Sequence, residues 1–240
     1  MEGHRVCGDR WVAYFDILGF QNMLEKRKVP GHLPLFVKNY YAHVLDALKR
    51  ATDYSLDDLS IAWFSDSFLL SARDDTVRSF AHIVSAAGDF FREAVGSMMP
   101  LRAAVALGDF YTDTENSVFV GQALIDAHKC AEAQDWIGLV ITPDAYKAQE
   151  KFDDSNLLRD RDYVEYDVPF KEGKFERLYA YRPDSNCDFI DDILDQLRQM
   201  QSSAKHDHPD EYEQKHRQKY ERTIQFYERS PRTGVRTTWR

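Results

Sequence analysis

The sequence predicts an α+β fold, in which pairs of strands alternate with long helices. Short runs of apolar, aromatic and β-branched residues are typical of buried strands, and several lie next to one another with only a brief polar break. Two longer stretches, 33–48 and 76–95, instead repeat apolar residues at helical spacing. With 43% apolar residues among 240, the chain can bury a large core around such elements.

The individual elements follow from the same patterns. Strands 59–64 and 68–72 flank the break Ser65-Asp66-Ser67 and therefore predict a hairpin. The helix over 76–95 is expected to end at Gly96, because glycine commonly terminates helices. The other expected elements are a strand over 11–15, the helix over 33–48, strands over 101–107 and 117–120, a helix over 122–133, a strand over 139–142, a short helix beginning at Pro143, and hairpin strands over 163–166 and 175–181.

The residue pattern of the sequence changes near residue 185. This change predicts a main domain over 1–185 and a helical extension over 186–240. Helices are expected over 188–201 and 211–229. The second is highly charged with a thin apolar stripe, which fits packing either on a partner subunit or on its own domain. The last residues, SPRTGVRTTWR, are expected to be poorly ordered.

Composition excludes several classes of protein. The formal net charge of -9 argues against a broad nucleic-acid-binding surface, although a local pocket filled by metal ions could still bind a polyanion. No apolar run approaches the length of a membrane span, and the first residues lack the apolar region of a signal peptide. Cys7, Cys130 and Cys187 form no CxxC pair. We therefore expect a cytoplasmic protein with reduced thiols.

Asp16 and Asp66 are the first candidates for chemistry, because each directly follows an apolar strand. If those strands are neighbours, the two carboxylates can converge on one or two divalent cations. Mg²⁺ and Mn²⁺ accept carboxylate oxygens and complete their coordination with phosphate oxygens, which suits phosphoryl transfer. Each aspartate also has a purely structural interpretation, as a helix cap or as a turn residue.

Other catalytic signatures are absent from the sequence. It has no GxxxxGK[ST] loop, no GxGxxG after a strand, no GxSxG turn and no HExxH helix. The run His206-Asp207-His208 could bind a metal loosely, but a solvated linker explains it more simply.

Three segments in order resemble the catalytic domain of class III nucleotidyl cyclases. They are AYFDILGFQNML, IAWFSDSFLLSA and LRAAVALGDF…SVFVGQALIDAHKCAEAQ, and the resemblance covers roughly residues 10–182. The matching positions are Asp16, Gly19 and Phe20, then Asp66, then Arg102 and Gly108, and finally Gly121 at the start of a helix.

The resemblance implies a ferredoxin-like βαββαβ core and the cyclisation of a nucleoside triphosphate with release of pyrophosphate. It further implies two Mn²⁺ or Mg²⁺ ions per active site, bound by Asp16, Asp66 and the backbone of Ile17. The backbone over 17–20, which comprises Ile17, Leu18, Gly19 and Phe20, would cradle the phosphates. Asp16→Ala would then abolish metal binding and turnover while leaving the fold intact.

The resemblance also implies a homodimer with its active sites between subunits. One subunit would supply the aspartates, and the other would supply Lys129, in the place of a transition-state arginine, and Lys171, which would bind the terminal phosphates. A monomer would be inactive. Lys129 could instead be a solvated helix residue, and Lys171 a charge at a hairpin tip.

Departures from the family pattern bear on the base. Ala62 and Val118 stand where adenine-specific members carry Lys and Asp, so the usual base contacts are missing and adenine is disfavoured. The ribose-contacting Asn of the family falls on Ile125, next to Asp126. The candidates near the base are Tyr54, Trp63, Phe64 and Arg102, and only one of the adjacent Trp63 and Phe64 can face a pocket while the other is core.

With these departures and the helical tail, the chain is most similar to the Pycsar pyrimidine cyclases of bacterial antiphage defence. That similarity implies synthesis of cyclic UMP or cyclic CMP, with UTP favoured over CTP, and a separate effector that the product activates. Three alternatives stay open: a purine cyclase, a catalytically silent nucleotide sensor, and a scaffold whose acidic surface recruits a partner.

Overall fold

The computed structural model describes residues 5–20, 42, 59–152, 156–183, 187–207 and 209–229. Apart from Ala42, the helix expected over 33–48 lies outside these residues. Tyr54 and the last eleven residues of the chain lie outside them as well.

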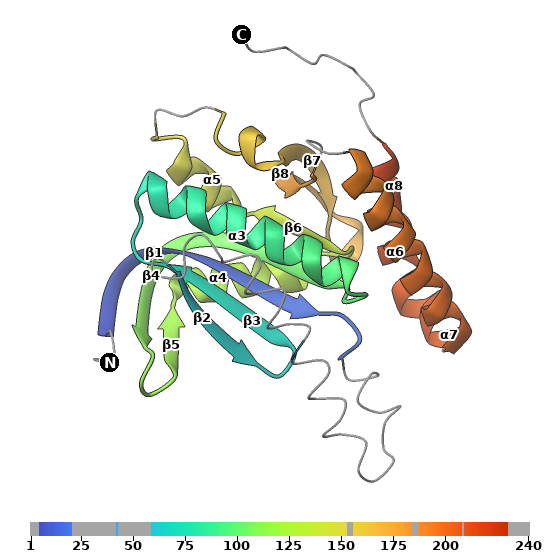
Figure 1. The fold of residues 1–240 in the computed structure, drawn as a ribbon, viewed down its shortest axis with the longest axis horizontal. Helices are drawn as coiled ribbons and strands as arrows, with labels where there is room; N and C mark the ends of the chain where they lie inside the picture. Colours follow the sequence, from blue (N-terminus) through green and yellow to red (C-terminus); the bar gives the residue numbers. More distant parts are fainter. Residues whose placement is uncertain are drawn as a thin grey trace.

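One mixed sheet organises the molecule (Figure 1). Its strands follow the order β2-β3-β1-β4-β6-β8-β7, and β5 pairs with the far end of β4. The β4–β6 pair is parallel, and the other pairs are antiparallel. The strands are β1 (Arg5–Ile17), β2 (Leu59–Phe64), β3 (Ser67–Ala72), β4 (Leu101–Asp113), β5 (Val118–Gly121), β6 (Gly138–Ile141), β7 (Tyr163–Pro169) and β8 (Phe175–Tyr181).

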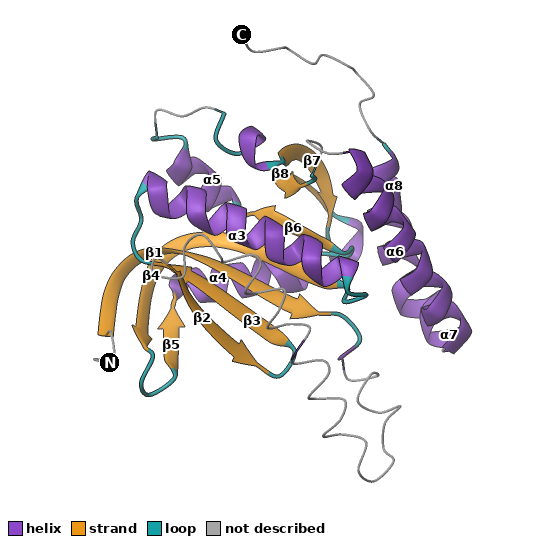
Figure 2. Cartoon of the chain, viewed as in Figure 1, coloured by secondary structure: helices purple, strands orange, loops and turns teal. Residues whose placement is uncertain are grey.

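Helices α3 (Val77–Gly96) and α4 (Gln122–Ala133) cover opposite faces of this sheet (Figure 2). Alternate residues of a strand point to opposite faces, and β1 shows both directions. Phe15 packs edge-on against Phe90 of α3, while Tyr14 packs against His128 of α4. Because Asp16 is two residues from Tyr14, it belongs to the face that α4 covers.

Shorter helical segments connect the remaining strands. The helix α5 (Pro143–Gln149) begins at the expected proline, and Thr142 caps it by accepting a hydrogen bond from the Ala145 N–H. The 3₁₀ turns η1 (Arg159–Arg161) and η2 (Lys171–Gly173) precede β7 and join β7 to β8.

The C-terminal extension packs on its own domain. It consists of α6 (Cys187–Asp207), α7 (Pro209–Glu211), the π-helical turn η3 (Tyr212–His216) and α8 (Arg217–Glu228), with α6 and α8 running together along one side of the molecule (Figure 1). Ile193 and Leu197 of α6 are buried in the main core. Of the two arrangements left open by the sequence, the described residues therefore show packing in cis.

The expected elements within the described residues are present, and several differ in extent. Strand β1 begins at Arg5 rather than residue 11, because it pairs with β4 along its whole length. The helix expected over 211–229 is divided by η3. Gly96 is the last residue of α3 rather than its stop, and Met98 takes the left-handed conformation at φ +62°.

Among the described residues, none of the helices is long and apolar enough to cross a membrane.

Candidate functional site

The two aspartates converge at one end of the sheet. Asp16 lies near the end of β1, in register with Ser67 at the start of β3, and Asp66 occupies the turn between β2 and β3. The Ile17 N–H donates a hydrogen bond to the Asp66 carbonyl at 3.0 Å, which fixes the turn against β1. The strands that lead to Asp16 and Asp66 are therefore neighbours, as the metal hypothesis requires.

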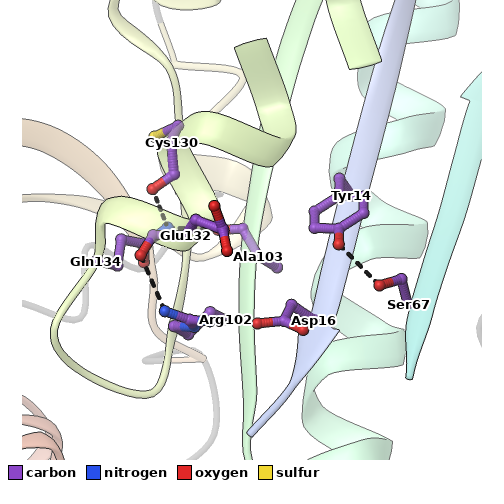
Figure 3. A network of polar contacts seen from close by, with 8 residues as sticks. All are labelled: Tyr14, Asp16, Ser67, Arg102, Ala103, Cys130, Glu132 and Gln134. Atoms are coloured by element: carbon purple, nitrogen blue, oxygen red, sulfur yellow. Dashed lines mark hydrogen bonds and ion pairs between the residues drawn. The ribbon is translucent and has the colours of Figure 1, made fainter. Parts of the chain in front are cut away.

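Asp16 forms a largely buried ion pair with Arg102 of β4, directly across the strand pair (Figure 3). Arg102 is only 8% exposed, and its Nη1 also donates to the Glu132 carbonyl at 2.9 Å. Its buried Nε has no acceptor among the described residues. Arg102, a sequence candidate for the base, thus lies beside the aspartate.

The charges around Asp16 are mixed. Burial raises the pKa of the Asp16 carboxyl above its usual value, and the hydrogen bond and charge of Arg102 oppose this change. The negative charges of Asp66 and Glu132 raise the same pKa further. No hydrogen bond or ion pair within the described residues involves the Asp66 carboxylate. The site thus brings excess negative charge together around one guanidinium.

Tyr14 and Ser67 lie beside the aspartates, and the sequence patterns did not single them out as candidate site residues. The Tyr14 hydroxyl and Ser67 Oγ share a hydrogen bond of 2.7 Å (Figure 3). Burial raises the pKa of the Tyr14 hydroxyl, and the nearby Asp16 and Asp66 carboxylates contribute to that rise. The two-residue period of β1 could have identified Tyr14, since it places Tyr14 and Asp16 on the same face.

The donors present fit Mg²⁺ or Mn²⁺ bound together with a substrate. No group of three or more His, Cys, Asp or Glu side chains in the described part of the chain could hold a metal by itself. Mg²⁺ is commonly bound by one or two carboxylates and takes its other ligands from phosphates and water. Asp16 and Asp66 match that donor set, provided that Asp16 exchanges its contact with Arg102 for the metal.

The phosphate-cradle residues form the segment after β1. The Leu18 N–H donates to the Pro100 carbonyl at 2.9 Å, and Ile17 is buried. Gly19 is exposed with φ +75°, a left-handed conformation that favours glycine. Phe20 is half-buried.

Lys129 and Lys171 share a pocket of about 540 Å³ between α4 and the β7–β8 hairpin. Neither ammonium group has a hydrogen-bond or ion-pair acceptor among the described residues. Neither Asp16 nor Asp66 lines this pocket. A single chain therefore brings the two lysines together and the two aspartates together, but in separate places.

The remaining base and ribose candidates lie mainly toward the β2–β5 side. Ala62 is 7% exposed and packs with Val12 and Ala123 in a small core cluster. Trp63 packs on Phe68, whereas Phe64 is 51% exposed and contacts Phe119, so the two side chains have different surroundings. Val118 on β5 and Ile125 on α4 are exposed as well.

No family model and no curated protein matches the chain by sequence. Solved structures do match its fold. The adenylyl cyclase CyaB from P. aeruginosa aligns with 12% identity and a TM-score of 0.51, over 75% of this chain and 98% of that one. The catalytic core of a rhodopsin-guanylyl cyclase with converted specificity, in complex with ATPalphaS, aligns with 13% identity and a TM-score of 0.52 over the same shares.

A third match is the monomeric guanylyl cyclase domain of the RhoGC fusion protein from the aquatic fungus Blastocladiella emersonii, with 13% identity and a TM-score of 0.50 over 75% of this chain and 98% of that one. At such identities the likeness is one of fold. The chain therefore has the mixed α+β fold of class III adenylyl and guanylyl cyclase catalytic domains.

Proposed function

We propose that this protein is a metal-dependent nucleotidyl cyclase, which converts a ribonucleoside triphosphate to its 3′,5′-cyclic monophosphate and pyrophosphate. The observation that carries the proposal is the convergence of Asp16 and Asp66 at the end of β1, within the cyclase fold. A role for Asp66 only as a turn residue would not require its carboxylate to lie close enough to Asp16 to raise the pKa of that carboxyl.

The reaction is a single displacement at phosphorus. The 3′ oxygen bonds to the α-phosphorus, the bond to the β-phosphate oxygen breaks, pyrophosphate leaves with the electron pair, and the hydroxyl proton passes to solvent. Asp16 and Asp66 would hold two Mg²⁺ or Mn²⁺ ions, which when bound activate the attacking oxygen and neutralise the leaving group. The backbone over 17–20 would position the phosphates through its N–H groups.

The transition state also needs cations, because negative charge develops on the phosphoryl oxygens. Lys129 and Lys171 are suited to this role, since their ammonium groups have no acceptor in the described structure. They lie apart from the aspartates of the same chain, so we infer that the complete site forms between two subunits. Each subunit of a homodimer would contribute the aspartates to one site and the lysines to the other.

An exposed apolar surface supports this arrangement. Phe64, Val118, Val120 and Ile125 are large apolar residues that remain solvent-exposed in the single chain. They belong to β2, β5 and α4, and Phe64 contacts Phe119, whose side chain is on the face of β5 opposite Val118 and Val120. Exposed apolar side chains of this size are often covered in a protein–protein interface. A second copy of the chain is the partner that would complete the site.

For the substrate we propose a pyrimidine nucleotide, UTP rather than CTP. Ala62 is buried among apolar neighbours and Val118 is apolar, so neither offers a hydrogen bond to an adenine edge. The preference for UTP rests on the resemblance to Pycsar cyclases. The same resemblance implies a cytoplasmic role in antiphage defence, where the cyclic product would activate a separate effector.

A catalytically silent nucleotide sensor is the second candidate. It is favoured by the Asp16–Arg102 ion pair, because this pair occupies a carboxylate that a metal would need. A purine cyclase remains the alternative within the same reaction class.

Incubation of the purified protein with each of the four ribonucleoside triphosphates and Mn²⁺, with products identified by mass, tests the proposal. We expect one cyclic pyrimidine monophosphate and an equal amount of pyrophosphate from the wild type. Asp66→Ala should yield none. A cyclic purine product would refute the pyrimidine assignment, while nucleotide binding without any product would favour the sensor.

A further inference from the structure

A hydrogen bond and an ion pair hold the C-terminal helix α8 against the loop that leads into β6. This loop lies next to the candidate site. The buried Thr223 hydroxyl accepts a hydrogen bond from the Ile137 N–H at 2.8 Å and lies 3.2 Å from the Ile137 carbonyl. Arg222 forms an ion pair with Asp135 of the same loop. The next residue after Ile137, Gly138, is in register with Arg102 on the neighbouring strand. The anchor of α8 is therefore only one strand away from Arg102.

Lys219 lies on the same face of α8, one helical turn before Thr223. Thr223 Oγ1 donates to the Lys219 carbonyl at 2.8 Å, as expected for residues four apart on a helix. This face carries Lys219, Arg222, Thr223 and Phe226, and its last member packs on Trp136. Since the rest of the stripe contacts the 135–137 loop, the half-buried Lys219 side chain is directed to the domain rather than to solvent.

The same loop connects this region with the β7–β8 hairpin. The Asp135 N–H donates a hydrogen bond to the Pro169 carbonyl at 2.9 Å. Gln134 forms an isolated antiparallel β-bridge with Phe170, the residue before Lys171. The positive charges of Arg102 and Lys171 both lie within electrostatic range of the Lys219 ammonium. Burial lowers the pKa of the Lys219 ammonium, and the positive charges of Arg102 and Lys171 lower it further, against the carboxylates of Asp135 and Asp16.

This group of cations is not fully neutralised by the described residues. Asp135 is paired with Arg222, and Asp16 with Arg102. The ammonium groups of Lys171 and Lys219 have no hydrogen-bond or ion-pair acceptor in the described structure, and the buried Arg102 Nε has none either. An anion with several oxygens would accept hydrogen bonds from the ammonium groups of Lys171 and Lys219 at once.

We propose that Lys219 is a phosphate-binding residue, through which the C-terminal extension contributes directly to binding the triphosphate of the nucleotide. The inference rests on the proposed function for the identity of the substrate. It assigns the tail a task beyond packing: α8 would place a cation at the phosphate end of the site, and the Thr223 and Arg222 anchors would hold it there.

The test compares Lys219→Met with Lys219→Arg and with Lys205→Met, a matched loss of an exposed lysine on α6. Calorimetry would measure the affinity of each for inorganic triphosphate, for UTP and for UMP, with and without Mn²⁺. We expect Lys219→Met to bind triphosphate and UTP about ten- to a hundredfold more weakly, the worth of one charge-assisted hydrogen bond. Affinity for UMP should not change, and Lys219→Arg and Lys205→Met should match the wild type.

A purely structural role would lower the melting temperature of Lys219→Met without a selective loss of triphosphate affinity, and would overturn the inference. Tighter binding or faster turnover in that variant would also overturn it, because α8 would then restrain the site. A wild type that forms no cyclic product, but whose triphosphate affinity still depends on Lys219, would contradict the proposed function and leave the phosphate site standing.

Discussion

The two candidate metal ligands are not equivalent residues. Asp16 neutralises the buried guanidinium of Arg102, whereas no described residue pairs with the Asp66 carboxylate. Removing one partner of a buried ion pair leaves the other charge uncompensated, which typically costs about 3–5 kcal/mol. Asp16→Ala should therefore lower the free energy of unfolding by an amount in this range. Asp66→Ala should change it by less than about 1 kcal/mol. Urea unfolding measures both.

The double variant Asp16→Ala/Arg102→Leu provides the control, because it removes both charges of the pair. It should recover part of the stability lost in Asp16→Ala, since no unpaired charge remains. Equal stabilities for the two single aspartate variants would contradict the described pairing. It follows that Asp66→Ala, rather than Asp16→Ala, separates the loss of metal binding from the loss of fold.

The cysteines should differ sharply in reactivity. Cys7 is exposed, while burial raises the pKa of the Cys130 thiol to about 12. The thiolate is the reactive form, so iodoacetamide at pH 8 should modify Cys130 at least tenfold more slowly than Cys7. Peptide mass spectrometry over time measures both rates. Comparable rates in the folded protein would show that Cys130 is accessible.

The same pKa change has a consequence for stability. The folded state holds the Cys130 proton more tightly than the unfolded chain does. The corresponding stabilisation is therefore complete below the unfolded pKa and is lost as the pH rises toward about 12. The Cys130→Ala variant should show a weaker loss of stability in this alkaline range.

At the scale of elements, the attachment of α8 depends on one hydroxyl group. Thr223 is fully buried, and it accepts the hydrogen bond of the Ile137 N–H. Thr223→Val keeps the shape but leaves that buried donor without a partner, which should cost about 1–3 kcal/mol in the free energy of unfolding. Thr223→Ser should cost less, because it retains the hydroxyl. If Thr223→Val were as stable as the wild type in urea, α8 would not be held by this contact.

Local elements were predicted well because they depend on local patterns. The β2–β3 hairpin follows from two apolar runs around Ser65-Asp66-Ser67, and α4 from the glycine and apolar positions near its start. The extent of β1 was underestimated, since its first residues, RVCGDR, contain no apolar run and become a strand only through pairing with β4. Pairing between distant segments leaves no periodic signal in either one.

The candidate site, like the fold, could be predicted only where it depends on local sequence. The convergence of Asp16 and Asp66 could be anticipated from their positions after apolar strands, given neighbouring strands. Two other features could not be anticipated. Arg102 lies beside Asp16 because of the β1–β4 register, and Lys219 lies near Arg102 because of the path of the C-terminal extension. Both depend on tertiary packing. The helical stripe of α8 indicated a buried face but not its partner.

Under the proposed function, the molecule as a whole presents two incomplete halves of a site. The aspartates lie at the end of β1, and Lys129 and Lys171 line a pocket between α4 and the β7–β8 hairpin. A two-fold axis that brings one half of each subunit against the other half of its partner would create two equivalent sites. Mutations in the two halves should then behave differently when variants are mixed.

Mixing two inactive variants tests this arrangement directly. After subunit exchange, Asp66→Ala and Lys129→Ala form a heterodimer in which one site carries both defects and the other carries none. At equal amounts half of the dimers are heterodimers, so activity should recover to about a quarter of the wild-type level. Lys129→Ala mixed with Lys171→Ala should recover nothing, because both lysines belong to the same half and every site keeps one defect. Rescue of that second pair, or failure of the first despite demonstrated exchange, would show that the aspartates and lysines do not meet across a dimer.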